Sequence, residues 1–178
     1  MSVATPVLVL PGLGNSGPQH WQTRWELRHP QWQRVNLGDW DNPVCEDWVH
    51  VLDIAVQACP SPPVLVAHSL ACLLVAHWAH HSALAPKGAF FVAVPDPQGT
   101  SFPNTPRGFV PVPMAPFAFR SLVVASANDP FGSLTHAKRC AMVWGSAFVD
   151  IGQAGHINAD SGHGEWEEGY ALLQRVMP

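Results

Sequence analysis

The sequence predicts a three-layer α/β/α sandwich built on a mostly parallel sheet of about six strands. Three observations support this fold class. Short, continuous apolar runs alternate along the chain with stretches whose apolar residues recur at helical spacing. Many of the 14 glycines and 18 prolines lie between these segments, where turns are expected. The length of 178 residues, with 47% hydrophobic and 12% charged residues, suits a single folded domain over residues 1–178.

Six apolar runs are the candidate strands. The clearest ones are short and unbroken, as in strands that are buried on both faces of a parallel sheet. The first of them is stopped by Pro11-Gly12, and the second is the weakest. The runs cover residues 7–10, 34–37, 64–67, 89–94, 122–125 and 147–151.

Five stretches with helical periodicity lie between or after these runs. Trp21 and Trp25 share one face of the first stretch, and Pro43 suits the start of the second. The stretches cover residues 17–28, 43–58, 69–80, 133–144 and 165–176. Residues 95–116 contain many prolines and little periodicity, so we predict a long loop that shapes a functional pocket.

The charge pattern argues against nucleic-acid and membrane partners. The formal net charge is −4, and the 9 lysines and arginines form no basic cluster. Binding to a phosphate backbone or to an anionic lipid surface needs such a cluster. The longest apolar stretch, residues 64–78, is interrupted by polar residues and is shorter than the ~20 residues of a membrane-spanning helix. We therefore expect neither a nucleic acid nor a membrane as a partner.

The cysteines and the first residues predict a cytoplasmic location. None of the four cysteines belongs to a C-x-x-C pair, which favours reduced thiols over a disulfide framework. Residues 1–6 contain no positively charged segment and no long apolar segment, the two parts of a secretory signal.

A metal site is a weaker interpretation of the histidines. His77 and His81 have i, i+4 spacing, but no carboxylate or cysteine joins them at the usual ligand spacing. We expect a polar helix face at this place, and we expect no metal and no organic cofactor.

Ser69 lies in Ala67-His68-Ser69-Leu70-Ala71, between a predicted strand and a predicted helix. The nucleophile elbow of α/β-hydrolases occurs in this context and is usually written G-x-S-x-G, because small flanking residues let a sharp turn close. Here alanine, the next smallest residue, replaces both glycines. We predict that Ser69 is a nucleophile, with the alternative that it caps the helix. We expect His68 to point away from it.

Two further polar residues follow predicted strands. Asp129 suits a carboxylate that orients a histidine, and the alternative is an ordinary Asp-Pro turn. His156, directly after Gly155, suits a general base, and the alternative is one histidine in a surface loop. The chain order Ser, Asp, His is that of α/β-hydrolases, and each residue follows a separate strand. Together these residues predict a catalytic triad of Ser69, Asp129 and His156.

Two backbone N–H groups are candidates for an oxyanion hole. One belongs to Leu70, directly after the nucleophile, and the other to Leu13, in the loop Pro11-Gly12-Leu13-Gly14. For this loop the alternatives are a plain turn and a phosphate-binding loop, although no G-K-[ST] follows.

Several aromatic residues suit either the pocket or the core. His20 and Trp21 follow the glycine-containing loop and suit the border of a pocket, but Trp21 equally suits helix packing. The same two interpretations, an apolar acyl pocket or core packing, apply to Phe102, Phe109, Phe117 and Phe131.

Four stretches of the chain carry a family resemblance. They are VLVLPGLGNSGPQHWQTRWE, VAHSLACLLVAHW, SANDPFGS and GQAGHINADSGHGEW, and they span nearly the whole chain in this order. They resemble the small serine hydrolases related to retinoblastoma-binding protein 9 and its bacterial relatives. The resemblance implies a compact α/β-hydrolase fold without a large cap domain. It also matches Ser69, Asp129 and His156 to the triad positions of the family, whereas Ala71 departs from the glycine that is common in the wider superfamily.

The expected activity is that of a carboxylesterase-like serine hydrolase. It would cleave a small ester, thioester or amide through an acyl-enzyme on Ser69, with a small-molecule acyl substrate as its partner. The alternatives are a non-catalytic binding protein on a hydrolase scaffold and an acyltransferase that passes the acyl group to an alcohol or amine. The sequence indicates neither the natural substrate nor the oligomeric state.

Overall fold

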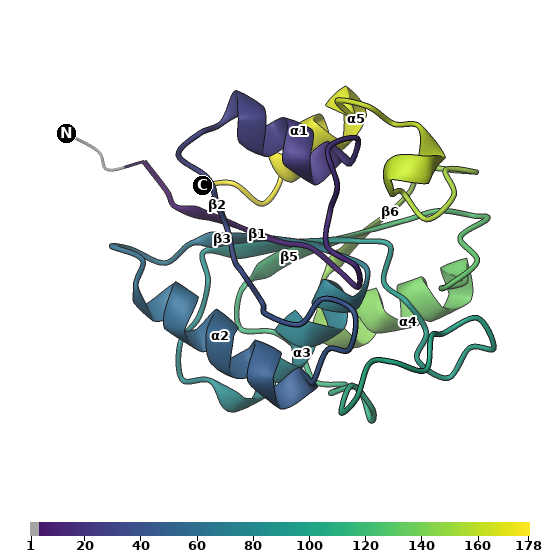
Figure 1. The fold of residues 1–178 in the computed structure, drawn as a ribbon, viewed down its shortest axis with the longest axis horizontal. Helices are drawn as coiled ribbons and strands as arrows, with labels where there is room; N and C mark the ends of the chain where they lie inside the picture. Colours follow the sequence, from purple (N-terminus) through teal and green to yellow (C-terminus); the bar gives the residue numbers. More distant parts are fainter. Residues whose placement is uncertain (1–3) are drawn as a thin grey trace.

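A six-stranded sheet forms the centre of the computed structural model, which describes residues 4–178 (Figure 1). Residues 1–3, which belong to the segment without the two parts of a secretory signal, lie outside the described residues. The strands are β1 (Val7–Leu10), β2 (Gln33–Arg34), β3 (Val64–His68), β4 (Gly88–Val92), β5 (Arg120–Ala125) and β6 (Ala147–Asp150). Their order is β2-β1-β3-β4-β5-β6, and each neighbouring pair is parallel.

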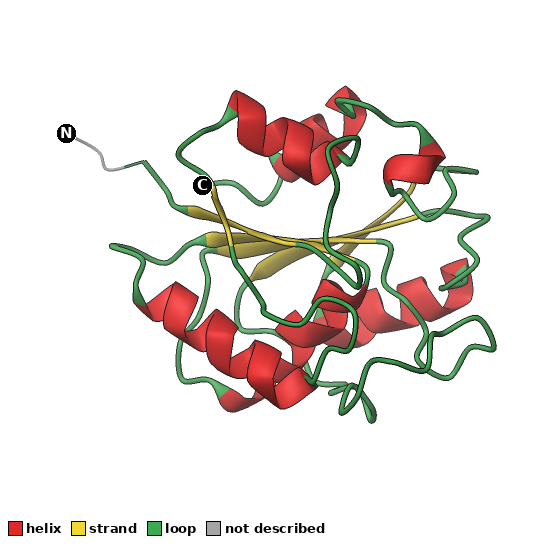
Figure 2. Cartoon of the chain, in the orientation of Figure 1, coloured by secondary structure: helices red, strands yellow, loops and turns green. Residues whose placement is uncertain are grey.

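Helices cover both faces of the sheet. One face carries α1 (Trp21–Arg28) and α5 (Glu167–Leu173), above the sheet in Figures 1 and 2. The opposite face carries α2 (Cys45–Gln57), α3 (Leu70–His81) and α4 (Leu134–Trp144). A short 3-10 helix, η1 (Ala159–Ser161), follows β6. The predicted α/β/α sandwich with a mostly parallel sheet is therefore confirmed.

Alternation along the strands fills two separate cores. In β4, Phe91 packs in the core on the side of α2, α3 and α4, whereas its neighbour Phe90 packs beneath α1 and α5. Leu65 and Val66 of β3 divide in the same way. Because helices cover both faces, these strands are buried along their whole length, which is why they read as continuous apolar runs.

The connection between β4 and β5 agrees with the prediction. Residues 93–119, all of them described, contain no helix, so β4 and β5 are joined by a long loop rather than by a β-α unit. This confirms the loop that we predicted over residues 95–116. Strand β4 ends before residues 93 and 94 because Ala93 has a φ of 57°, which an extended strand does not accommodate.

Several predicted boundaries were also wrong. The second strand covers Gln33–Arg34 and not residues 34–37, because it is an edge strand that pairs only with β1. The first helix begins at Trp21, since His20 is extended and accepts a hydrogen bond from Gln22 N–H as the N-cap. The last helix covers Glu167–Leu173, which is shorter than the predicted residues 165–176.

The sheet topology determines where a ligand would bind. The chain passes from β1 to β2 on one side and then from β3 to β6 on the other, so its direction reverses between β1 and β3. Ligands of open parallel sheets bind beyond the carboxyl ends of the strands at such a reversal. The residues that follow β1 and β3 are therefore the first to consider.

Two further predictions from the sequence were that a membrane is not a partner and that the cysteines are reduced thiols. Within residues 4–178 every helix is too short or too polar to cross a membrane. The four cysteines are unpaired. Burial raises the pKa of each thiol, that of Cys45 to about 12 and that of Cys140 to about 11. These thiols are therefore held in the protonated, weakly nucleophilic form.

Candidate active site

Ser69 lies on a sharp turn between β3 and α3. Its φ of 54° and ψ of −122° are rare for a residue with a side chain, and such strain collects at functional sites. The flanking Ala67 and Ala71 are completely buried, so the turn closes with alanine at both positions. The Ser69 side chain makes no capping hydrogen bond with α3. Ser69 occupies the N-cap position of α3, but the alternative that its side chain caps the helix is wrong.

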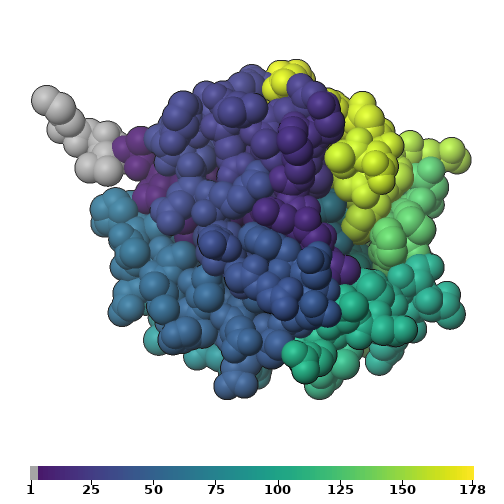
Figure 3. All heavy atoms as spheres, in the orientation of Figure 1, coloured from purple at the N-terminus to yellow at the C-terminus, as the bar shows by residue number. Residues whose placement is uncertain are grey.

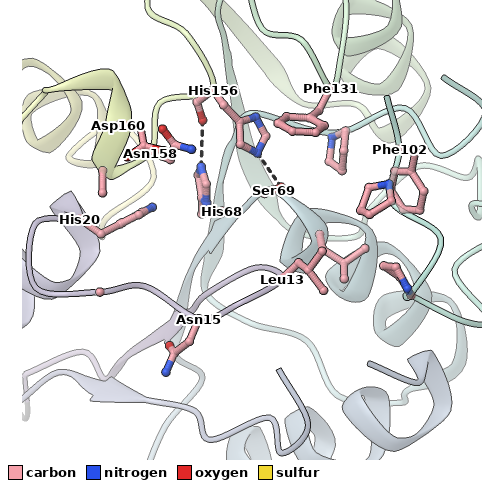
Figure 4. Close-up of a pocket in the computed structure, with 16 residues that line it drawn as sticks. Leu13, Asn15, His20, His68, Ser69, Phe102, Phe131, His156, Asn158 and Asp160 are labelled. Atoms are coloured by element: carbon pink, nitrogen blue, oxygen red, sulfur yellow. Dashed lines mark hydrogen bonds between the residues drawn. The ribbon is translucent and has the colours of Figure 1, made fainter. Parts of the chain in front are cut away.

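The three predicted triad residues lie in direct contact. The distance between His156 Nε2 and Ser69 Oγ is 2.8 Å, and Nδ1 of the same ring lies 2.9 Å from each carboxylate oxygen of Asp129. Figure 4 shows the imidazole pointing at the serine. Because the carboxylate accepts the Nδ1–H, the Nε2 lone pair is free to accept the serine O–H. The Asp129 side chain is 2% exposed and that of His156 10%, so water screens this contact little.

Hydrogen bonds between two loops fix the spacing of the triad aspartate and histidine. The Oγ of Ser126, the residue directly after β5, accepts the N–H of Ala154 at 2.9 Å. The Oδ1 of Asn128 accepts the N–H of Gly155 at 2.8 Å. The loop after β5 therefore holds the loop after β6 at the residues directly before Asp129 and His156.

His68 holds the same loop from the other direction. Its Nε2–H donates to the carbonyl oxygen of His156 at 3.0 Å, and its ring lines the cavity in front of Ser69. The prediction that His68 points away from the nucleophile was wrong, because strand alternation ends at the sharp turn. Trp21 adds a second anchor, since its indole N–H donates to the carbonyl oxygen of Ile157 at 2.8 Å. Sequence reasoning missed both anchors.

The two other histidines of the site are neutral near neutral pH. Burial, together with the nearby Arg34, lowers the pKa of His20 to about 3. Burial also lowers the pKa of His68 well below its ordinary value, with His20 as a second contributor. Neither ring therefore places a positive charge beside the triad.

The candidate oxyanion donors face the same cavity as the serine. Leu13 and Leu70 both line it, and within residues 4–178 neither backbone N–H donates a hydrogen bond. Gly12 brings their two segments together. A Cβ on Gly12 would lie 2.9 Å from the His68 carbonyl oxygen and 3.0 Å from the Ser69 Cβ. The first loop therefore packs directly against the nucleophile turn.

This contact predicts that Gly12→Ala lowers kcat/KM by roughly tenfold to a hundredfold. The added methyl group would push the first loop away from the turn, and small displacements of oxyanion donors are costly. Steady-state kinetics with a short-chain ester measures the effect. A circular dichroism melt of Gly12→Ala separates this effect from a loss of folded protein. Wild-type kinetics in Gly12→Ala would show that this packing is irrelevant to turnover.

Ser69 and His156 open into a cavity of about 360 Å³ beyond the carboxyl ends of the strands. In Figure 3 the first loop, coloured purple, and the loop after β6, coloured yellow, meet at the surface, and both line the cavity. The long loop between β4 and β5 contributes Phe102 to the lining of the cavity. Phe131 also lines it, with its ring centroid 4.6 Å from that of His156. Of the phenylalanines that suited two interpretations, these two line the cavity. Phe109 packs against Trp48, and Phe117 against Trp144.

Of the i, i+4 pair of helical histidines, His77 is used in packing and His81 is exposed. His77 is buried, and its Nε2 lies 3.1 Å from the carbonyl oxygen of Phe109, which it satisfies as a donor. In residues 4–178 no group of three or more histidine, cysteine, aspartate or glutamate side chains is arranged to hold a metal ion.

Comparisons with known proteins identify the family of the chain. A family model described as serine hydrolase matches residues 7–175. A protein described as a YdeN-like hydrolase, from Pectobacterium atrosepticum, has a similar structure with a TM-score of 0.84 and 32% identity, over 98% of this chain and 94% of that one. The ydeN gene product of B. subtilis has a TM-score of 0.77 and 22% identity, over 97% of this chain and 98% of that one.

More distant structures share the fold. A thermophilic esterase from Thermogutta terrifontis has a TM-score of 0.70 at 14% identity, over 100% of this chain and 92% of that one. No curated protein matches the chain.

Proposed function

The chain belongs to the serine hydrolase family, and from this premise we propose that it hydrolyses a small, uncharged ester, thioester or amide through an acyl-enzyme on Ser69. One observation carries the proposal. An unbroken line of hydrogen bonds runs from the Ser69 hydroxyl through His156 to the Asp129 carboxylate. This arrangement activates a serine for attack on a carbonyl carbon.

In the acylation step, His156 takes the Ser69 proton at Nε2 while Oγ attacks the substrate carbonyl carbon. The Asp129 carboxylate accepts the Nδ1–H and stabilises the imidazolium that forms. The backbone N–H groups of Leu13 and Leu70 bind the developing oxyanion. When the tetrahedral intermediate collapses, the Nε2 proton passes to the leaving alcohol, thiol or amine, and the acyl group stays on the serine.

Water completes the turnover. His156 removes a proton from a water molecule that attacks the acyl carbonyl carbon, and it returns this proton to Ser69 Oγ as the carboxylic acid leaves. The same two backbone N–H groups stabilise the second oxyanion. No step needs a group other than the residues of this chain, the substrate and water.

The cavity favours an uncharged substrate. Its described lining includes no lysine or arginine, and its one carboxylate belongs to Asp160. The chain as a whole carries a formal net charge of −4. A carboxylate or phosphate on the substrate would therefore enter without a cationic partner and would be repelled by Asp160.

We predict that a para-nitrophenyl ester of a short neutral acid has a kcat/KM about tenfold higher than that of the same ester ending in a carboxylate. The rate of para-nitrophenol release measures both values at one ionic strength. Asp160→Asn should narrow the difference, because it removes the repelling charge. Equal or faster hydrolysis of the anionic ester would contradict the proposed preference for uncharged substrates.

A further inference from the structure

The cavity in front of Ser69 has two chemically different sides. Figure 4 shows Phe102 and Phe131 on one side of the serine, and His20, Asn158 and Asp160 on the other. The apolar side suits hydrocarbon. The polar side begins at the N-terminal end of α1, where His20 is the cap residue.

The tautomer of His20 follows from its role as the cap. Its Nδ1 lies 3.2 Å from the backbone nitrogen of Gln22 and accepts that N–H. A neutral imidazole that accepts at Nδ1 carries its proton on Nε2. This Nε2–H is buried, and it has no hydrogen-bond partner among the described residues. His20 as a whole is 4% exposed, so an unpaired donor sits in an almost fully buried side chain.

The neighbours of His20 do not satisfy this donor. The closest aromatic ring is that of His68, which is in edge-on contact with His20 at a centroid distance of 4.7 Å. The Nε2–H of His68 is already committed to the carbonyl oxygen of His156. Figure 4 shows the tip of the His20 ring directed toward His68 and the centre of the site. Buried donors in native proteins are normally paired, so an unpaired one that lines a cavity is available to a ligand.

We propose that the Nε2–H of His20 is a specificity-determining donor that binds an oxygen acceptor of the substrate on the side of the cavity next to α1. This proposal rests on the proposed hydrolase function and deepens it. The substrate class becomes an uncharged acyl compound with hydrocarbon on one side of the scissile bond. On the other side it carries an ether, hydroxyl or carbonyl oxygen.

The burial of His20 supports a donor of this kind. Because its pKa is lowered to about 3, the ring stays neutral and keeps the same tautomer over the pH range in which a serine hydrolase works. A neutral donor pairs with an uncharged oxygen without bringing an unbalanced charge into the site. This agrees with a cavity whose described lining has no lysine or arginine.

Two substitutions separate the binding role of His20 from its capping role. The side-chain amide of asparagine reaches about as far as Nδ1, so His20→Asn keeps a cap for Gln22 N–H and removes the Nε2–H donor. The amide of glutamine reaches about as far as Nε2, so His20→Gln keeps a donor and loses the cap. Thermal unfolding checks this design, with His20→Gln expected to melt about 3 °C lower than His20→Asn.

The readout is a ratio of kcat/KM values for matched esters. The first pair varies the acid: it consists of the para-nitrophenyl esters of hexanoic acid and of the analogue in which an oxygen replaces one methylene. The second pair varies the alcohol: it consists of the butyrate esters of pentanol and of the analogue in which an oxygen replaces one methylene. Each kcat/KM is divided by the rate constant for alkaline hydrolysis of the same ester, which corrects for intrinsic reactivity. In wild type we expect the corrected kcat/KM of the oxygen-containing ester to be about tenfold higher than that of the hydrocarbon ester in one of the two pairs. His20→Gln should keep this preference, and His20→Asn should lose it.

Two outcomes would overturn the proposal, and labelling of Ser69 by a fluorophosphonate distinguishes them. If wild type is labelled and hydrolyses both pairs, but the ratios are the same in wild type and His20→Asn, His20 is a helix cap and not a substrate donor. If Ser69 of folded wild type is not labelled and no ester is hydrolysed, the proposed hydrolase function fails, and this proposal fails with it.

Discussion

Replacing Ser69 with alanine is expected to lower kcat/KM for a short-chain ester by roughly five orders of magnitude while the protein stays folded. The loss is large because Oγ is the atom that forms the acyl-enzyme. In its absence only substrate binding and the oxyanion donors act on the substrate. Steady-state ester hydrolysis gives the rate constants, and a circular dichroism melt gives the stability.

The structure also predicts a small effect of this substitution on stability. The serine side chain makes no hydrogen bond to the helix that it precedes, so alanine removes only the bond to His156. We expect a melting temperature within about 3 °C of wild type. A folded Ser69→Ala protein that keeps most of its esterase activity would refute Ser69 as the nucleophile.

Replacing Asp129 with asparagine is expected to lower kcat/KM by roughly three to four orders of magnitude. The amide keeps the local turn, because Oδ1 can still accept the Phe131 N–H that it accepts at 2.9 Å in the wild type. The amide N–H then faces His156 Nδ1 in place of an acceptor oxygen. The imidazole then adopts the tautomer with its proton on Nε2. A protonated Nε2 can no longer accept the proton of Ser69. The expected loss is therefore in kcat, with little change in fold.

The chain offers a matched control for this substitution. Asp96 also lies beside a histidine, with Oδ2 3.7 Å from His136 Nδ1, but neither residue lines the cavity of the triad. Asp96→Asn makes the same chemical change at that second pair and should leave kcat/KM within about twofold of wild type. Similar losses of kcat/KM in both aspartate variants would indicate a general effect on the fold. An unchanged kcat/KM in Asp129→Asn would show that Asp129 does not orient His156.

Much of the fold could be predicted from local sequence, for a physical reason. Strands that are covered on both faces need apolar side chains at every position, so β3 and β4 stand out as continuous runs. The triad candidates could be predicted because the carboxyl ends of parallel strands meet at one edge, and each candidate directly follows such a run.

The parts that could not be predicted depend on contacts between distant segments. The second strand is short because only β1 pairs with it, and pairing cannot be seen in one apolar run. The first helix begins at a histidine cap, outside the residue types that usually mark helix starts. The direction of His68 depends on the turn at the next residue and on a carbonyl oxygen 88 positions away in the chain.

The unpaired Nε2–H of His20 is another feature that the sequence could not predict. A histidine in the sequence carries no sign of its tautomer or of which ring nitrogen lacks a partner. Both depend on the cap hydrogen bond with Gln22 and on the burial of the ring beside His68. Sequence could therefore place His20 near the pocket, but only the structure gives its donor a direction.

The most direct test of the central claim is to treat the purified protein with a fluorophosphonate and to locate the adduct by mass spectrometry, with Ser69→Ala as the control. Such a reagent reacts rapidly with a serine only where a base and oxyanion donors are assembled around it. The proposed function predicts one adduct, on Ser69, that is absent from the alanine variant. A folded wild-type protein that forms no adduct, or an equal adduct in both proteins, would contradict an assembled triad and would favour a binding protein on a hydrolase scaffold.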